Sequence, residues 1–205
     1  MKETFLNGSI KAIKSKYSDY DEIKIEELRY GLEGLYLSIT KLIIISIVAI
    51  FTGIFKEMII LLFFFNIIRA VSFGLHAKNS ITCLISSTIV FIICPILCKK
   101  IIINKIIRLF IFIPTIILIA IFSPADTEKR PIISKKRRSI YKILSITISA
   151  TYMILCIFIK NNFICNTILC SLLIQLFLVT PISYKLFGVS YNNYKEYLKK
   201  EVKGG

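Results

Sequence analysis

Residues 81–98 read ITCLISSTIVFIICPILC and contain no charged side chain. A helix needs about 17 to 25 mostly apolar residues to cross the hydrocarbon core of a bilayer, and this run has that length. The stretch therefore predicts a transmembrane helix. Apolar runs recur along most of the chain, at residues 42–55, 58–68, 106–122, 139–159 and 163–183.

These runs predict an all-α integral membrane protein with about six transmembrane helices, in a chain of which 56% of the residues are hydrophobic. The run at 106–122 reaches full length if its helix begins near Ile101. The first two runs are short, and only Lys56 and Glu57 separate them. We expect them to form a helical hairpin whose first helix extends back through residues 36–40. Four spans plus a re-entrant pair is the alternative.

The net charge of +15 is distributed as an orientation signal. Lys and Arg concentrate in alternate segments between the spans, and such segments lie in the cytoplasm. We therefore expect cytoplasmic N- and C-termini, with the basic residues contacting anionic lipid and not nucleic acid. Most of the 27 Lys and Arg residues then fall in the cytoplasmic segments, which are residues 1–41, 69–80, 123–142 and 185–205.

The chain divides into three predicted parts. Residues 1–35 are polar, with no apolar core ahead of a cleavage site, and their apolar residues recur at helical spacing. This pattern predicts an amphipathic helix on the inner membrane surface, with packing on the helical bundle as the alternative. Residues 36–184 form the transmembrane part, and residues 185–205 form a basic cytoplasmic tail.

Five of the six cysteines lie inside or at the outer ends of the predicted spans: Cys94, Cys98, Cys156, Cys165 and Cys170. Buried cysteine packs as a small apolar residue, which is the role we expect for these five. A disulfide at the outer ends, involving Cys98 or Cys165, stays open. One histidine and scattered thiols do not give the spacing of a zinc site, so we predict no metal and no cofactor.

The remaining cysteine, Cys83, follows the only histidine of the chain, His76, in the stretch RAVSFGLHAKNSITC at residues 69–83. Gly74 is suited to end the helix before this stretch. Asn79 or Ser80 is suited to cap the helix after it, which makes Cys83 the third or fourth residue of that helix.

A cysteine at a helix N-terminus lies where the helix dipole favours the thiolate. His76 on the preceding loop could take the thiol proton and return it to a leaving amine, and free helical N–H groups could hold an oxyanion. We therefore expect a catalytic pair. The alternative is that His76 is a polar anchor at the membrane surface and Cys83 a packing residue. Candidates for a third, orienting group are Asn66, Asn79 and Asp126.

The stretches RAVSFGLHAKNSITC and FSPADTEKRPI together resemble the accessory gene regulator protein B family, which are membrane cysteine endopeptidases of Gram-positive bacteria. The resemblance covers most of the chain. It implies that Cys83 is the nucleophile and His76 its general base, and that Arg69 and Gly74 support them. It also implies that the loop at 124–131 contributes, and there we expect Asp126, Lys129 and Arg130 to contact the substrate.

The resemblance further implies the substrate and the reaction. The substrate is a quorum-sensing peptide precursor with an amphipathic leader and a charged C-terminal tail. The enzyme removes the tail through an acyl-thioester, which a Cys or Ser of the peptide attacks to form a thiolactone or lactone. A homodimer in the plasma membrane, with its active site near the cytoplasmic face, is the expected form. The alternatives are a peptide transporter without peptidase activity and a non-catalytic membrane assembly factor.

Overall fold

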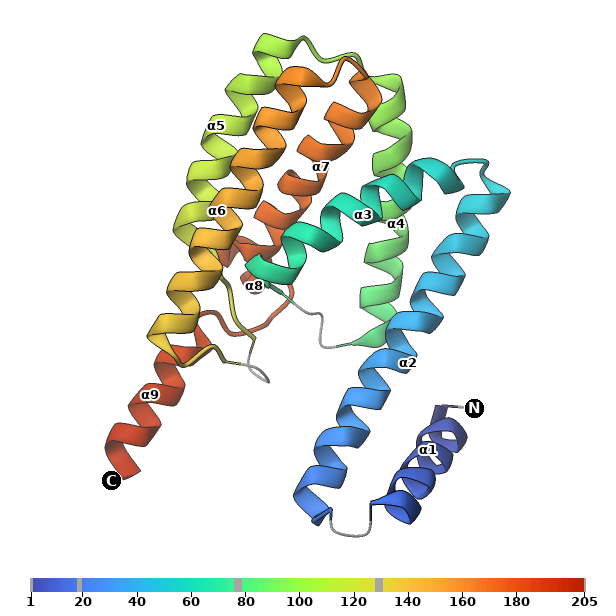
Figure 1. The fold of residues 1–205 in the computed structure, drawn as a ribbon, viewed down its shortest axis with the longest axis vertical. Coiled ribbons are helices and arrows are strands. Elements are labelled where there is room, and N and C mark those ends of the chain that lie inside the picture. The colour runs from blue at the N-terminus through green and yellow to red at the C-terminus, as the bar shows by residue number, and fades with distance from the viewer. Residues whose placement is uncertain (1, 18–19, 76–78, 128–130, 205) are drawn as a thin grey trace. The chain divides into compact units, whose positions relative to one another are not determined.

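The computed structural model describes residues 2–17, 20–75, 79–127 and 131–204, and the elements in them are helices (Figure 1). One isolated parallel bridge joins Phe73 to Ala125. The all-α prediction is confirmed. The helices are α1 (Lys2–Lys16), α2 (Glu22–Phe51), α3 (Phe55–Ser72), α4 (Ser80–Lys100), α5 (Lys105–Phe122), α6 (Lys135–Phe158), α7 (Asn162–Val179), α8 (Pro181–Leu186) and α9 (Asn193–Gly204).

Five of these helices are long and apolar enough to cross a membrane, so the chain is a multi-pass membrane protein. The prediction of about six spans exceeds this count by one, and α3 is the difference. Its 18 residues include three charged side chains, Lys56, Glu57 and Arg69, whereas each of the five spans has an 18-residue stretch with at most two. The five spans are Lys24–Phe51, Ile81–Lys100, Lys105–Phe122, Lys135–Phe158 and Asn162–Val179.

α2 ends at Phe51 and α3 begins at Phe55, so the break between the two predicted helices is confirmed, but the turn that joins them differs from the prediction. The turn lies at residues 52–54, where Gly53 has a φ of 69°. Lys56 and Glu57 do not separate the helices, because they belong to the first turn of α3, where an acidic side chain is favoured by the helix dipole. The first helix also begins earlier than expected, at Glu22, so the predicted boundary at residue 35 falls inside α2.

Residues 1–48 form one compact unit, which contains α1 and most of α2. Lys2 and Glu33 form an ion pair at 2.7 Å between these two helices, and Arg29 and Glu3 form another at 2.9 Å. α1 buries Leu6 and Ile10. The position of α1 on the inner membrane surface stays a prediction.

Residues 49–205 form the second unit, in which α7 is the central helix. α7 packs against α3, α4, α5, α6 and α8. In Figure 1, α5, α6 and α7 run side by side, whereas α3 crosses them obliquely. Half of the apolar window of α7 is buried, more than in any other span. The core around it includes Ile68, Phe112, Tyr152, Ile168 and Leu172.

Polar contacts stabilise one end of this unit, where α4 ends and α5 and α7 begin. Arg108 is buried and donates to Ile103 O at 3.0 Å and to Asn162 Oδ1 at 2.7 Å. Asn166 accepts a further bond from Arg108 and donates to Ile101 O at 2.7 Å. The start of α3 reaches the same end, because Glu57 is paired with Lys99 at the end of α4.

Three prolines and all six cysteines lie in helices of the second unit. Pro95 and Pro114 lie inside α4 and α5. Pro181 does not kink a span, because it occupies the first turn of the separate short helix α8, where a missing N–H costs nothing. None of the six cysteines, all of which the structure describes, forms a disulfide. Cys98, Cys156 and Cys165 are buried.

Candidate active site

Cys83 lies in the first turn of α4, as predicted. Asn79 is the N-cap, since its side chain accepts a hydrogen bond from Ile81 N at 3.0 Å. Ser80 is the first residue of the helix and Cys83 the fourth, with its N–H bonded to Asn79 O at 3.0 Å. The Cys83 side chain is half-buried.

His76 lies outside the described residues, as do Lys129 and Arg130. The structure therefore describes both sides of the histidine loop but not the imidazole. Gly74 and Leu75 precede it and are buried, and Asn79 follows it and is exposed. The role of His76 as general base stays a prediction.

The Arg69 side chain binds the backbone at the end of α3 and at the start of the loop between α3 and α4, which contains His76. Its guanidinium donates to Phe73 O at 2.6 Å, to Gly74 O at 3.2 Å and to Leu75 O at 2.6 Å. The planar fork of arginine suits this use, because several N–H groups point in fixed directions. The supporting residue of the motif thus organises the start of the loop that leads to the candidate nucleophile.

Gly74 lies where two other segments approach the loop. Its N–H donates to Ala125 O at 2.8 Å, and Leu75 N donates to Leu178 O at 2.9 Å. Gly74 has a φ of 109°, and a Cβ atom there would lie 2.7 Å from Leu178 O. Only glycine fits this position without displacing the backbone of α7. α3 ends before it, with Phe73 as the C-cap.

Two residues that the sequence did not indicate complete this support. Gln175 of α7 is fully buried and donates from Nε2 to Phe73 O at 2.7 Å. Ser145 of α6 accepts hydrogen bonds from Ser72 and Ser123, each at 2.9 Å. The spacing of these residues within apolar runs carried no signal, since isolated Gln and Ser are common in spans.

Asp126, in the second motif, binds the start of α9. It is 3% exposed, and its two carboxylate oxygens accept the backbone N–H groups of Asn193 at 3.1 Å and Tyr194 at 2.8 Å. It therefore caps the N-terminus of α9. The backbone carbonyl of Asp126 accepts a bond from the Tyr184 hydroxyl at 2.7 Å. Burial raises the pKa of Tyr184, so this hydroxyl keeps its proton and donates. A substrate contact of Asp126 stays a prediction.

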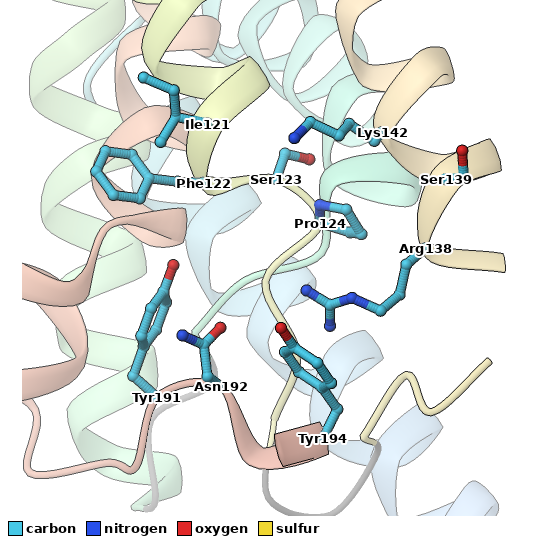
Figure 2. Close-up of a pocket in the computed structure, with 10 residues that line it drawn as sticks. All are labelled: Ile121, Phe122, Ser123, Pro124, Arg138, Ser139, Lys142, Tyr191, Asn192 and Tyr194. Carbon is cyan, nitrogen blue, oxygen red and sulfur yellow. The ribbon is translucent and has the colours of Figure 1, made fainter. Parts of the chain in front are cut away.

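A pocket of about 550 Å³ opens beside this loop (Figure 2). Its walls come from the end of α5, the start of α6 and the segment before α9. Arg138 and Lys142 of α6 line it together with two tyrosines, Tyr191 and Tyr194. Arg138 lies 3.9 Å from Asp126 Oδ2 and 3.5 Å from the centre of the Tyr194 ring.

Comparison with known proteins identifies the family. The family model described as Accessory gene regulator B matches residues 7–179. The chain belongs to the AgrB family. The matched range contains both motifs, including Arg69, Gly74, Cys83 and Asp126.

Curated relatives cover a similar range. A putative AgrB-like protein of Clostridium acetobutylicum is 32% identical over 183 residues, which are 89% of this chain and 88% of the relative. A putative AgrB-like protein of Listeria monocytogenes serotype 4a is 27% identical over 184 residues, 90% of each chain. Accessory gene regulator protein B of Staphylococcus aureus is 31% identical over 150 residues, 72% of this chain and 78% of the relative. These relatives come from Gram-positive bacteria. No solved structure matches the chain.

Proposed function

We propose that this chain is a membrane-embedded cysteine endopeptidase that removes the C-terminal tail of a quorum-sensing peptide precursor and promotes its cyclisation. One observation carries the proposal: in an AgrB family member, Cys83 lies in the first turn of α4, and Arg69 organises the start of the loop that leads to His76. Nucleophile and base then come from one loop and one helix start.

The proposed reaction has two steps. His76 takes the proton of the Cys83 thiol, and the thiolate attacks the carbonyl carbon before the tail. The C–N bond breaks, His76 gives its proton to the leaving amine, and the leader segment stays on Cys83 as a thioester. A Cys or Ser side chain of the peptide gives its proton to His76 and attacks the thioester carbonyl; the C–S bond to Cys83 breaks, the ring closes and the Cys83 thiolate leaves.

The first turn of α4 offers donors for the oxyanion. The N–H of Ile81 donates to the Asn79 side chain, and the N–H of Cys83 donates to the Asn79 carbonyl. We propose that the backbone N–H groups of Ser80 and Thr82 stabilise the developing charge, since the first N–H groups of a helix have no partner within it. The supporting roles of Asn79 and Ser80 then differ: the first fixes the helix start and the second contributes a donor.

The surroundings of Cys83 suit a thioester intermediate. A peptide bond is more stable than a thioester, so the first step runs uphill and water must be kept from the acyl-enzyme. The half-buried position of Cys83 supports this exclusion. An amphipathic leader bound to the same membrane surface would raise the effective concentration of the substrate.

We propose a plasma-membrane location with both termini and the active site on the cytoplasmic side. The two ends of α3 support a sixth crossing, because Glu57 meets the end of α4 whereas Gly74 meets Ala125 after α5. α3 thus connects the two ends of the second unit even though it contains three charged residues. With α3 counted, the spans alternate and the basic start of α6 lies inside.

The proposed partners are the precursor peptide, membrane lipids and a second copy of the chain. Both oxygens of Asp126 are engaged with α9, so a substrate contact at the 124–131 loop would come mainly from Lys129 and Arg130. These two cations would attract acidic groups of the precursor tail.

A peptide exporter without peptidase activity is the second candidate, and two charged residues weigh against it. A transport path usually contains ionisable side chains within the membrane. Here Lys105 donates to Ile157 O at 2.9 Å, and Arg108 is bound to Ile103 O and two asparagines at a helix end. Both cations join chain segments, which is a structural use.

The test is cleavage by the full-length protein in lipid vesicles, with the precursor peptide encoded beside its gene as substrate. Mass spectrometry should find a peptide adduct on Cys83 and a cyclic product lighter than the hydrolysed peptide by one water molecule. Cys83→Ala and His76→Ala should abolish both. Cys94→Ala, a half-buried cysteine of the same helix, should retain both.

The outcomes separate the candidates. Cleavage that persists in Cys83→Ala would contradict the peptidase mechanism. Uptake of the intact precursor into vesicles by both wild type and Cys83→Ala would favour the exporter. Loss of activity in Cys94→Ala as well would point to damage of α4 in general and not to chemistry at Cys83.

A further inference from the structure

The pocket beside the second motif is basic on one wall and lacks acidic side chains in its lining. Arg138 and Lys142 lie one turn apart on α6 and both line it (Figure 2). Within the described residues, no carboxylate pairs with Lys142, which is exposed. The pocket therefore suits a negatively charged group.

Arg138 leaves hydrogen-bonding capacity for such a group. Its Nη1 atom is buried and has no hydrogen-bond partner in the described part of the chain. Asp126 lies 3.9 Å away, which is an ion pair beyond hydrogen-bond distance. Stacking on the Tyr194 ring at 3.5 Å fixes the guanidinium plane. A buried donor without a partner is costly, and an anion in the pocket would satisfy it.

The place of the pocket indicates where the anion comes from. Ile121 and Phe122 are the last residues of the span Lys105–Phe122, and both line the pocket. Ile121 is 60% exposed, and Ile117 and Ile113, at intervals of one turn on α5, are 54% and 52% exposed. An apolar stripe thus leads from the pocket along the span. Tyr191 and Tyr194 on the opposite wall are residues that favour the headgroup level of a membrane.

We propose that this pocket binds the phosphate-bearing headgroup of one anionic phospholipid of the inner leaflet, with its acyl chains along the exposed stripe of α5. Arg138 and Lys142 contact the phosphate. Tyr191 and Asn192 also line the pocket, and their hydroxyl and amide groups bind the polar part of the headgroup. Basic pockets between spans on this side of a membrane are known to take such lipids. An acidic peptide would use the charge but not the apolar stripe.

The experiment measures lipid retained by the full-length protein. Wild type and variants are placed in nanodiscs of phosphatidylcholine with a minority of phosphatidylglycerol, and native mass spectrometry counts the lipids that remain bound. Wild type should retain one phosphatidylglycerol in preference to phosphatidylcholine. Lys142→Gln should weaken that preference about fivefold, the effect of one basic charge at a membrane surface.

Controls and competitors make the result decisive. Lys136→Gln removes an exposed charge from the first turn of α6 outside the pocket and should leave retention unchanged. Arg138→Gln should reduce retention further, but Arg138 also contacts Asp126 and Tyr194, so Lys142→Gln is the deciding variant. Inorganic phosphate and a soluble Glu-rich peptide are added in separate arms.

Equal retention of the two lipids by wild type, or equal loss in Lys136→Gln and Lys142→Gln, would overturn the proposal. Displacement of phosphatidylglycerol by inorganic phosphate at similar concentration would show a plain anion site without use of the stripe. Displacement by the Glu-rich peptide that disappears in Lys142→Gln would assign the pocket to a peptide and overturn the lipid assignment. None of these measurements uses cleavage activity, so their outcome does not depend on the peptidase proposal.

Discussion

The N–H of Gly74 donates to the carbonyl of Ala125 at 2.8 Å. This bond joins the two sequence motifs, which are separated along the chain by all of α4 and α5. The bridge between Phe73 and Ala125 and the bond from Ala125 N to Ser72 O reinforce it. The loop that leads to His76 is thus positioned by the loop after α5, and both motifs contribute to one structure.

Gly74→Ala should destabilise the protein and abolish cleavage. The added Cβ would lie 2.7 Å from Leu178 O and 2.8 Å from Arg69 Nη1, so the backbone of α7 or the Arg69 fork must move. Strain at an unfavourable φ alone costs about 1–3 kcal/mol.

Gly53→Ala is the matched control, because Gly53 also has a positive φ, of 69°, but nothing lies within 4 Å of its added Cβ. Thermal unfolding in detergent and the cleavage assay compare the two. We expect Gly53→Ala to lower the Tm modestly and to keep activity. Equal effects of the two substitutions would show that the close contact with Leu178 is unimportant.

Arg69→Lys should lower the rate at which Cys83 reacts. A lysine keeps the positive charge but cannot bond to the carbonyls of residues 73, 74 and 75 together. The loop before α4 would lose its fixed shape. Alkylation of Cys83 by a soluble iodoacetamide, followed by mass spectrometry with Cys94 as internal reference, measures the change.

Arg29→Lys serves as the control for this substitution, since Arg29 makes an exposed ion pair with Glu3 in the first unit. It should leave the alkylation rate of Cys83 unchanged. If Arg69→Lys also reacts like wild type, the hydrogen-bond geometry of Arg69 does not control the reactivity of Cys83.

The spans and the start of α4 could be predicted from the sequence because each depends on local information. A long apolar run specifies a helix in a bilayer wherever it occurs. Capping rules, which involve neighbouring residues only, predicted Asn79 or Ser80 as N-cap and Cys83 as the third or fourth residue, and the structure has Asn79 and the fourth position. The end of the helix near Gly74 could be predicted for the same reason.

The contacts of Asp126, Gln175 and Ser145 could not be predicted, because they join residues far apart in the chain. Asp126 is expected on sequence grounds to face substrate, since it lies in a charged loop. In the structure its oxygens accept N–H groups of α9, 67 and 68 residues later. The count of spans differs by one at α3, whose charged residues lie near its two ends, where Glu57 pairs with Lys99 and Arg69 binds the carbonyls of residues 73–75.

Ser145→Ala should destabilise the second unit more than Ser149→Ala. Both serines are fully buried on α6, one turn apart. The Ser145 hydroxyl accepts bonds from Ser72 and Ser123, whereas the Ser149 hydroxyl donates to a carbonyl of its own helix, its one partner among the described residues. Losing a shared buried acceptor costs about 1–3 kcal/mol, so the Tm of Ser145→Ala should fall further. A larger loss in Ser149→Ala would mean that helix packing, and not the hydroxyl cluster, sets the stability here.

Asp126→Ala should release the first turn of α9 while leaving the spans folded. The substitution removes the acceptor of two backbone N–H groups, of Asn193 and Tyr194, and the partner of Arg138. An N-cap is worth about 0.5–2 kcal/mol, and a buried charged acceptor is worth more. Asp126→Asn keeps one acceptor oxygen and should lie between alanine and wild type. Hydrogen exchange followed at the Asn193 and Tyr194 amides measures the opening of the helix start.

Asp21→Ala is the control for this last change, because Asp21 accepts from the N–H of Lys24 at 2.9 Å in an exposed turn of the first unit. It should speed exchange near Lys24 and leave α9 unchanged. If exchange in α9 stays slow in Asp126→Ala, the cap does not hold the helix and the buried carboxylate is available for another role. Substrate contact, which the second motif predicts, would then be the role to test next, because an acceptor freed from α9 can meet a cationic group of the precursor.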